Sequence, residues 1–177
     1  LRQRDQARRV LLVTPAGLTK QWKEEMYHKF HIDEFRIYGT DFSISEQREW
    51  KQYDYVIGSM DTLKHENHIE KLLAAGNWDI VIFDEGHRLS RRQYGNKYDA
   101  SDRFDLASKL RLKTKAMIIL SATPHQGDQA KFIALLELLR PERRRELLQL
   151  DRNPEIIRDM IYRNHKADVT DKDGKFI

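Results

Sequence analysis

The segment Ile80-Val81-Ile82-Phe83-Asp84-Glu85-Gly86-His87 decides the fold class and gives the first functional hypothesis. Four apolar residues lead directly into two neighbouring carboxylates, and a buried strand tolerates such a pair only where it ends. A carboxylate at a strand tip can hold Mg²⁺ through its water shell, and the next acid can orient or deprotonate an attacking water. We expect Gly86 to allow a sharp turn, and His87 to offer a hydrogen-bonding group nearby. The alternative is that the acids only cap the next helix.

Four other short apolar runs lie before and after this segment, and each ends at polar or glycine residues. These runs are Val10–Val13, Phe35–Tyr38, Tyr55–Ile57 and Met117–Leu120. They are rich in valine and isoleucine and nearly continuous, which is typical of strands buried on both faces of a parallel sheet.

Helical patterns separate the runs. Apolar residues that share a helix face are Leu18, Trp22, Met26 and Phe30; Phe104, Ala107 and Leu110; and Phe132, Ile133, Leu136 and Leu139. Asp128 is placed to cap the last of these helices, and Pro141 to close it. Leu72 and Leu73 belong to a shorter predicted helix that ends near Gly76. Strands and helices alternating in this way predict a doubly wound α/β sheet.

Polar residues gather where the predicted strands end. They are Thr14, Ser59, Asp84, Glu85, Ser121 and Thr123. Ligands of open α/β sheets bind outside the carboxyl ends of the strands, so the sequence predicts a functional site at this edge.

The composition indicates a soluble globular protein. Of 177 residues, 40% are hydrophobic and 34% charged, the formal net charge is +4, and cysteine is absent. The mild basic excess permits a nucleic-acid partner without requiring one. No apolar run approaches the roughly 20 residues of a membrane-spanning helix and no signal peptide is visible, so we expect no membrane partner. The absence of cysteine agrees with a cytoplasmic location, which we expect.

Two motifs together resemble superfamily-2 helicases. Asp84-Glu85-Gly86-His87 is similar to motif II of that superfamily, its acidic Mg-ATP element, and Ser121-Ala122-Thr123-Pro124 is similar to motif III. Each follows an isoleucine-rich run, with a predicted helix between them, and this order suits the superfamily.

Other segments resemble the Swi/Snf-type branch. Leu11–Leu18 with Gln21-Trp22 is similar to motif Ia, Val56–Leu63 to motif Ib, and Leu138–Glu142 to the segment after motif III. The resemblance implies a three-layer RecA-like (P-loop NTPase-type) parallel sheet with flanking helices. It implies an incomplete first lobe over residues 1–142, and a helical or irregular extension toward the second lobe over 143–177.

The resemblance also implies roles for individual residues. Asp84 would coordinate Mg²⁺ through water, Glu85 would position the hydrolytic water of ATP, and His87 would couple them to Ser121, Ala122 and Thr123. Nucleic-acid contacts would come from Pro15, Ala16, Gly17 and Ser59, although Ser59 suits a simple turn equally well. The implied partners are double-stranded DNA, a second RecA-like lobe of the same parent chain and a larger protein complex, with a nucleoid-associated location in a bacterium.

The sequence also departs from the family pattern, and these departures bear on its activity. The sequence contains no Gly-x-x-x-x-Gly-Lys-Ser/Thr run, and we expect that phosphate-binding loop just upstream of Leu1. Without its lysine and the second lobe's arginine, phosphoryl transfer lacks its main electrostatic stabilisers, so we expect the isolated chain to be inactive. Two alternatives stay open: a lobe of a restriction or repair helicase, and a non-catalytic DNA- or protein-binding module derived from such a lobe.

Overall fold

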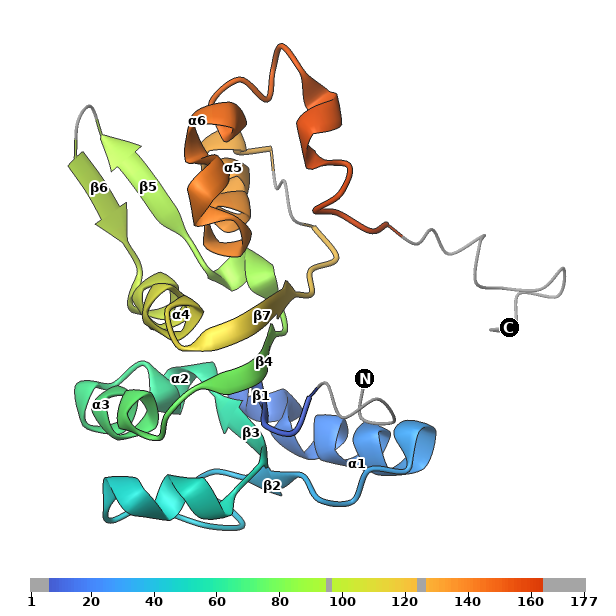
Figure 1. Cartoon of the computed structure of the whole chain (residues 1–177), viewed down its shortest axis with the longest axis vertical. Coiled ribbons are helices and arrows are strands. Elements are labelled where there is room, and N and C mark those ends of the chain that lie inside the picture. The colour runs from blue at the N-terminus through green and yellow to red at the C-terminus, as the bar shows by residue number, and fades with distance from the viewer. Residues whose placement is uncertain (1–6, 95–96, 124–126, 164–177) are drawn as a thin grey trace, which may run out of the picture.

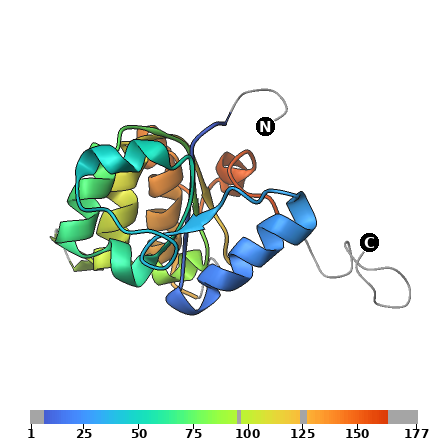
Figure 2. The ribbon, with the colours of Figure 1, turned by 90° about the horizontal axis from the view of Figure 1, so that it is seen from below.

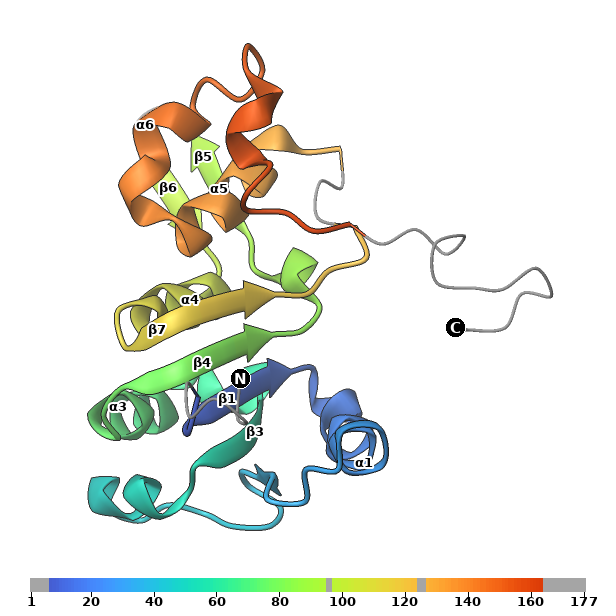
Figure 3. The ribbon, with the colours of Figure 1, turned by 45° about the vertical axis from the view of Figure 1, so that its right-hand side comes forward.

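A computed structural model describes residues 7–94, 97–123 and 127–163 of the chain. Its centre is a parallel sheet of five strands in the order β2-β3-β1-β4-β7 (Figure 1), and Figure 3 shows the arrows of β1, β4 and β7 side by side, pointing the same way. The strands are β1 (Val10–Thr14), β2 (Arg36–Ile37), β3 (Tyr55–Ser59), β4 (Trp78–Phe83) and β7 (Thr114–Ile119). Each predicted apolar run therefore overlaps a strand, and the predicted parallel α/β fold is confirmed.

Helices and short 3₁₀ turns connect the strands. The α-helices are α1 (Thr19–Phe30), α2 (Met60–Leu63), α3 (Glu66–Ala74), α4 (Asp102–Arg111), α5 (Gln129–Leu139) and α6 (Arg144–Leu147). The 3₁₀ segments are η2 (Ala16–Leu18), η3 (Gln47–Gln52), η4 (Gly86–Arg88), η5 (Pro141–Arg143) and η6 (Pro154–Ile157). Asp128 caps α5 as predicted, because its Oδ1 accepts from the backbone N–H of Lys131 at 3.1 Å.

Different helices pack against the two faces of the sheet. Figure 2 shows α1, in blue, on one side of the sheet, and the green and yellow helices on the other. Alternate residues of β4 follow this division: Val81 and Phe83 pack in the larger core with α2 to α5, whereas Ile80 and Ile82 face Trp22 of α1. This alternation is the two-residue period of a strand, and it decides which residues at the strand tips share a face.

The prediction that all five runs are buried on both faces is wrong for β7. This strand lies at the edge of the described sheet, and its burial alternates, with Ala116 exposed and Ile118 41% exposed. Met117 and Ile119 pack against the larger core. The exposed residues lie on the face of the sheet that carries α1, a helix whose main contacts are with β2 and β3 at the opposite edge of the described sheet.

An antiparallel hairpin of β5 (Arg91–Tyr94) and β6 (Lys97–Ala100) is an element that the sequence analysis did not predict. An ion pair between Arg91 and Glu137 attaches it to α5.

The predicted extension after residue 142 contacts the lobe within its described part, because Leu147 and Leu150 pack against α5. No helix among residues 7–94, 97–123 and 127–163 has the length and apolar character needed to cross a membrane.

Candidate functional site

The predicted acidic motif lies at the carboxyl end of β4, as expected. Asp84 directly follows β4, and its backbone N–H donates to the carbonyl of Val13 at 2.8 Å, so the ladder between β1 and β4 extends to this point. Since Thr14 stands opposite on β1, the side chains of Thr14 and Asp84 lie on the same face of the sheet. This face is the one that α1 covers.

Three donors surround the Asp84 carboxylate. Oδ2 accepts from the indole Nε1–H of Trp22 at 2.7 Å and from the hydroxyl of Thr14 at 3.2 Å. Oδ1 accepts from the backbone N–H of Glu85 at 2.8 Å. Hydrogen bonds to a carboxylate are stronger than neutral ones, so this set fixes the orientation of Asp84.

Glu85 adopts a left-handed backbone conformation, with φ of 51° and ψ of 47°. A residue other than glycine rarely adopts this conformation, which costs about 1–2 kcal/mol, and such strain tends to occur at functional sites. Glu85 stands at the N-cap position of η4, but its side chain makes no capping hydrogen bond. The interpretation of this acid as a simple helix cap is therefore not supported.

Gly86 is required for a different reason from the one predicted. Its φ is not positive, and Glu85 makes the sharp turn instead. A Cβ on Gly86 would lie 2.2 Å from Cγ2 of Ile119 and 3.3 Å from the carbonyl oxygen of Leu120. The glycine thus allows the turn after β4 to approach the end of β7, where its N–H donates to the Leu120 carbonyl at 2.8 Å.

The predicted coupling motif lies directly after this contact. Leu120 precedes Ser121, Ala122 and Thr123, and the hydroxyl of Ser121 accepts from the backbone N–H of Thr123 at 3.3 Å. His87 Nδ1 lies 3.0 Å from Glu85 Oε2, an ion-pair distance without hydrogen-bond geometry. The structure thus joins the two motifs through Gly86 and Leu120, and the coupling role of His87 stays a prediction.

The predicted nucleic-acid residues lie at the same edge of the sheet, in two different settings. Pro15 is buried, whereas Ala16 and Gly17 of η2 are exposed directly after β1. Ser59, at the end of β3, is 7% exposed, and its hydroxyl caps α2 by accepting from the backbone N–H groups of Asp61 and Thr62. The turn reading of Ser59 therefore describes its observed bonds, and its contact with nucleic acid stays a prediction.

Asp84 and Glu85 offer the kind of oxygen ligand that Mg²⁺ takes in proteins. Carboxylates are the hard oxygen ligands that Mg²⁺ prefers, and the ion usually keeps several waters and binds one or two carboxylates plus substrate phosphates. Within the described part of the chain, no group of three or more His, Cys, Asp or Glu could hold a metal by itself. Asp84 would hold the ion, with Glu85 beside it.

Two residues of this site were not predicted, namely Thr14 and Trp22 as partners of Asp84. Trp22 belongs to the apolar stripe Leu18, Trp22, Met26 and Phe30, whose helical spacing predicted a helix and said nothing of the indole N–H. The stripe is only partly buried, and Phe30 is 61% exposed. The alternation along β1 and β4 could have paired Thr14 with Asp84, but nothing in the sequence indicated the hydrogen bond of Trp22.

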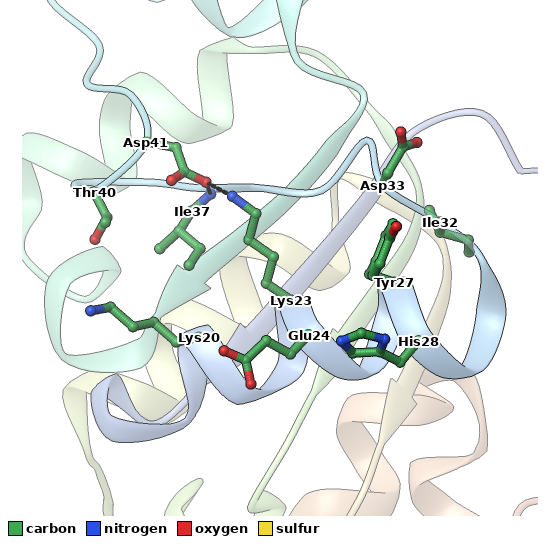
Figure 4. A pocket seen from close by; sticks show the side chains of 10 residues that line it. All are labelled: Lys20, Lys23, Glu24, Tyr27, His28, Ile32, Asp33, Ile37, Thr40 and Asp41. Atoms are coloured by element: carbon green, nitrogen blue, oxygen red, sulfur yellow. Dashed lines mark hydrogen bonds and ion pairs between the residues drawn. The ribbon is translucent and has the colours of Figure 1, made fainter.

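A hollow of about 400 Å³ lies on the other side of α1, between this helix and the segment around β2 (Figure 4). Lys23, Tyr27 and Ile37 are among its lining residues, and none of the predicted site residues lines it. Lys23 Nζ lies 2.5 Å from Asp41 Oδ2, which also accepts from the backbone N–H of Ile37 at 2.8 Å. These contacts tie α1 to β2, so they brace the helix that holds Trp22.

Comparisons with known proteins agree on one family. The family model described as "SNF2-related domain" matches residues 1–172. The RNA polymerase-associated protein RapA of Actinobacillus pleuropneumoniae is 30% identical over 145 residues, which are 76% of this chain and 15% of that protein. The uncharacterized ATP-dependent helicase YqhH of Bacillus subtilis is 30% identical over 137 residues, 76% of this chain and 21% of that protein.

Solved structures agree on the fold. The Sulfolobus solfataricus SWI2/SNF2 ATPase core in complex with dsDNA gives a TM-score of 0.61 at 16% identity, over 89% of this chain and 33% of that one. The same ATPase core domain in another structure gives 0.58 at 17% identity, over 90% and 30%. The parallel RecA-like sheet, the acid turn beside the end of β7 and the match over residues 1–172 lead to one conclusion: this chain belongs to the SNF2-related domain family of helicase-like ATPases.

Proposed function

We propose that the full-length protein is a DNA-dependent ATPase that moves along double-stranded DNA, and that this chain supplies its acidic motif. The chain spans only 15% of RapA and 21% of YqhH, so activity, substrate and partners of the whole protein belong to this proposal. The supporting observation is the tip of β4, where Asp84 is oriented by three donors and Glu85 takes a left-handed turn beside it.

In this proposal the two acids divide the chemistry. Asp84 would hold Mg²⁺ bound to the phosphates of ATP, an ion that supplies charge neutralisation as the phosphoryl group leaves. Glu85, next to it, would accept a hydrogen bond from the attacking water and orient it. The bond from Gly86 to Leu120 keeps this turn against the Ser121–Thr123 segment, which would report the state of the site to bound DNA.

Duplex DNA is the proposed substrate, and the exposed turn at Ala16 and Gly17 is its proposed contact. Backbone N–H groups and small residues at such turns suit phosphate oxygens, which position a protein on DNA without reading sequence. A SWI2/SNF2 ATPase core of similar fold has been solved with dsDNA. RapA is RNA polymerase-associated by its name, which favours a larger protein complex as a further proposed partner.

We also propose that the 177-residue chain alone does not hydrolyse ATP. Its sequence has no phosphate-binding loop of the Gly-x-x-x-x-Gly-Lys-Ser/Thr type. The exposed apolar residues Ile118 and Leu120 at the edge strand β7 favour packing against a further element of the parent protein, and that element would supply the loop.

The decisive experiment measures ATP turnover of the full-length protein with duplex DNA, single-stranded DNA, RNA or no nucleic acid. We expect stimulation by the duplex, and a fall of about 100-fold or more for Glu85→Gln, because a lost water-orienting base has costs of this order. Glu70→Gln, exposed on α3, is the matched control and should keep the wild-type rate. Unchanged turnover in Glu85→Gln would remove this acid from the mechanism, and RNA stimulation would contradict the duplex substrate.

The non-catalytic alternative makes a different prediction for the same protein. A module of this kind would bind duplex DNA or a protein partner without binding ATP, because it would lack a complete phosphate site. Nucleotide binding by the wild-type full-length protein, measured by calorimetry with Mg²⁺ and a non-hydrolysable ATP analogue, separates the two functions. Absence of binding would favour the module.

A further inference from the structure

The indole N–H of Trp22 joins α1 to the acidic motif at the carboxyl edge of the sheet. Its Nε1 lies 2.7 Å from Asp84 Oδ2, whereas the indole nitrogens of Trp50 and Trp78 have no hydrogen-bond partner among the described residues. An indole N–H only donates, so it can hold an acceptor in place but cannot take over the chemistry of an acid. Among the three tryptophans, Trp22 is therefore the one whose indole N–H makes a described hydrogen bond in addition to the packing of its ring.

Trp22 and Thr14 belong to one continuous unit that ends β1 and begins α1. Thr14 is the last residue of β1, and Trp22 lies in the first turn of α1, with Pro15–Leu18 between them. Two bonds brace this turn: the N–H of Leu18 donates to the carbonyl of Pro15 at 2.9 Å, and the hydroxyl of Thr19 donates to that of Ala16 at 3.1 Å.

Both side-chain donors to Asp84 come from this unit, one from each side of the turn. A ligand that displaces the turn would therefore move both donors relative to the carboxylate. The turn is open to a ligand, because Ala16 and Gly17 are exposed.

We propose that Trp22 is a positioning residue for Asp84, and that it couples duplex DNA bound at Pro15–Leu18 to the Mg-nucleotide bound at Asp84. This inference rests on the proposed function, which assigns DNA to the turn and the metal to the acid. Coupling between two bound ligands is reciprocal: each changes the affinity of the other by the same factor. The factor can therefore be measured from binding alone, without turnover.

The test uses the full-length protein and the fluorescence anisotropy of a short labelled duplex. The dissociation constant is measured without nucleotide, and then with Mg²⁺ and a saturating non-hydrolysable ATP analogue. We expect the wild-type constant to change by about 5- to 150-fold between the two conditions, and the change to fall below about twofold in Trp22→Phe. Phenylalanine removes the donor and keeps most of the apolar contact of Trp22 with the sheet, and the smaller ring volume is matched in the control below.

Trp50→Phe is the matched control, because it also removes an indole N–H from a buried tryptophan, but one that has no partner in the described structure. Its coupling should equal that of the wild type. If Trp22→Phe fails to fold, a threonine pair replaces it: Thr14→Val removes the other donor and should reduce the coupling, whereas Thr14→Ser keeps the hydroxyl and should preserve it.

The outcomes separate this inference from the proposed function. Wild-type coupling that persists in Trp22→Phe and Thr14→Val would overturn the positioning role and leave the proposed function intact. An equal loss in Trp50→Phe would overturn it too, because the effect would then come from packing. A wild type that binds no duplex or no nucleotide contradicts the proposed function itself, and this inference falls with it.

Discussion

Asp79 and Asp84 lie at the two ends of β4 and have different kinds of partner. Asp79, near the start of β4, accepts from the backbone N–H groups of Arg8 and Arg9 at 2.8 and 2.9 Å. Its other oxygen lies 2.6 Å from Lys115 Nζ. The ammonium and the two N–H groups hold the pKa of Asp79 down to about 2. This acid is a structural clamp between the strand and its neighbours.

Asp84 has donors as well, but no cation is among the partners that the structure gives it. Its partners are the indole of Trp22, the hydroxyl of Thr14 and one backbone N–H. Neutral donors orient a carboxylate without cancelling its charge, so a cation would still find a net negative group there. The two acids thus differ in the type of partner: an ammonium and backbone N–H groups hold Asp79, whereas neutral donors leave Asp84 able to take the cation that the proposed function assigns to it.

The sharpest way to break this comparison is to neutralise each acid in turn. We expect Asp84→Asn to lower ATP turnover of the full-length protein by about 100-fold or more, because the metal would lose its carboxylate. Asp79→Asn should leave turnover per folded molecule unchanged and lower the free energy of unfolding by about 1–2 kcal/mol, a value reduced for the solvent around Lys115. Turnover and urea unfolding measure the two effects. Equal losses of turnover in both variants would contradict the division of roles.

The turn beside Asp84 can be tested by adding one methyl group. Gly86→Ala should lower the free energy of unfolding by about 1–3 kcal/mol, because its Cβ would overlap Cγ2 of Ile119. Gly17→Ala is the matched control for stability: nothing lies within 4 Å of its Cβ, and we expect a change within about 0.5 kcal/mol. Urea unfolding of the chain measures both. Similar stabilities for the two variants would mean that the approach of the turn to β7 is not needed.

The pH dependence of stability should isolate the Asp79 end of the strand. Its pKa is lowered from 3.8 to about 2 in the folded chain, so its contribution is complete above pH 3.8 and is lost as the pH falls through this window. The stability difference between wild type and Asp79→Asn, about 1–2 kcal/mol at neutral pH, should therefore narrow as the pH falls from about 4 toward 2. Lys115→Met removes the main cause of the shift and should flatten this dependence. A difference independent of pH would contradict the ionic clamp.

Sequence alone predicted the sheet well, because its strands are short runs of valine and isoleucine that end at polar tips. It also placed Asp84 and Ser121 at the same edge, since parallel strands bring their carboxyl ends together. It did not predict the hairpin of β5 and β6, because Arg91–Ala100 is polar and has no alternating apolar residues. Nor did it predict that β7 lies at the edge of the described sheet, because the residues of a strand do not determine which strands lie beside it.

The sequence placed the two acids at the carboxyl edge of the sheet, but it did not indicate which side chains hold Asp84 in its orientation. Asp84 and Glu85 were recognisable because two carboxylates after an apolar run are chemically conspicuous. Trp22 was not, because helical spacing gives the face of an apolar residue but not what its polar atom meets. The steric need for a glycine at position 86 could not be predicted either, because it depends on the close approach to Ile119 of β7, a strand that follows later in the chain.

The smallest predicted effect concerns backbone strain, and it compares the acid turn with an ordinary helix end. Glu85 and His31, with φ of 51° and 54°, are the only non-glycine residues with positive φ among those that the structure describes, and His31 ends α1. Glycine relieves about 1–2 kcal/mol of left-handed strain and costs about 0.5–1 kcal/mol in unfolded-state entropy. We therefore expect His31→Gly and Glu85→Gly each to raise the free energy of unfolding by about 0.5–1 kcal/mol.

The two variants should differ in turnover of the full-length protein. His31→Gly should keep it, whereas Glu85→Gly should lose it, because the acid itself is removed while the turn becomes easier to form. More stability with less activity at Glu85 would show that the strained turn is kept for chemistry. A Glu85→Gly chain less stable than wild type would contradict this, since contacts of the glutamate side chain would then outweigh the strain of its backbone.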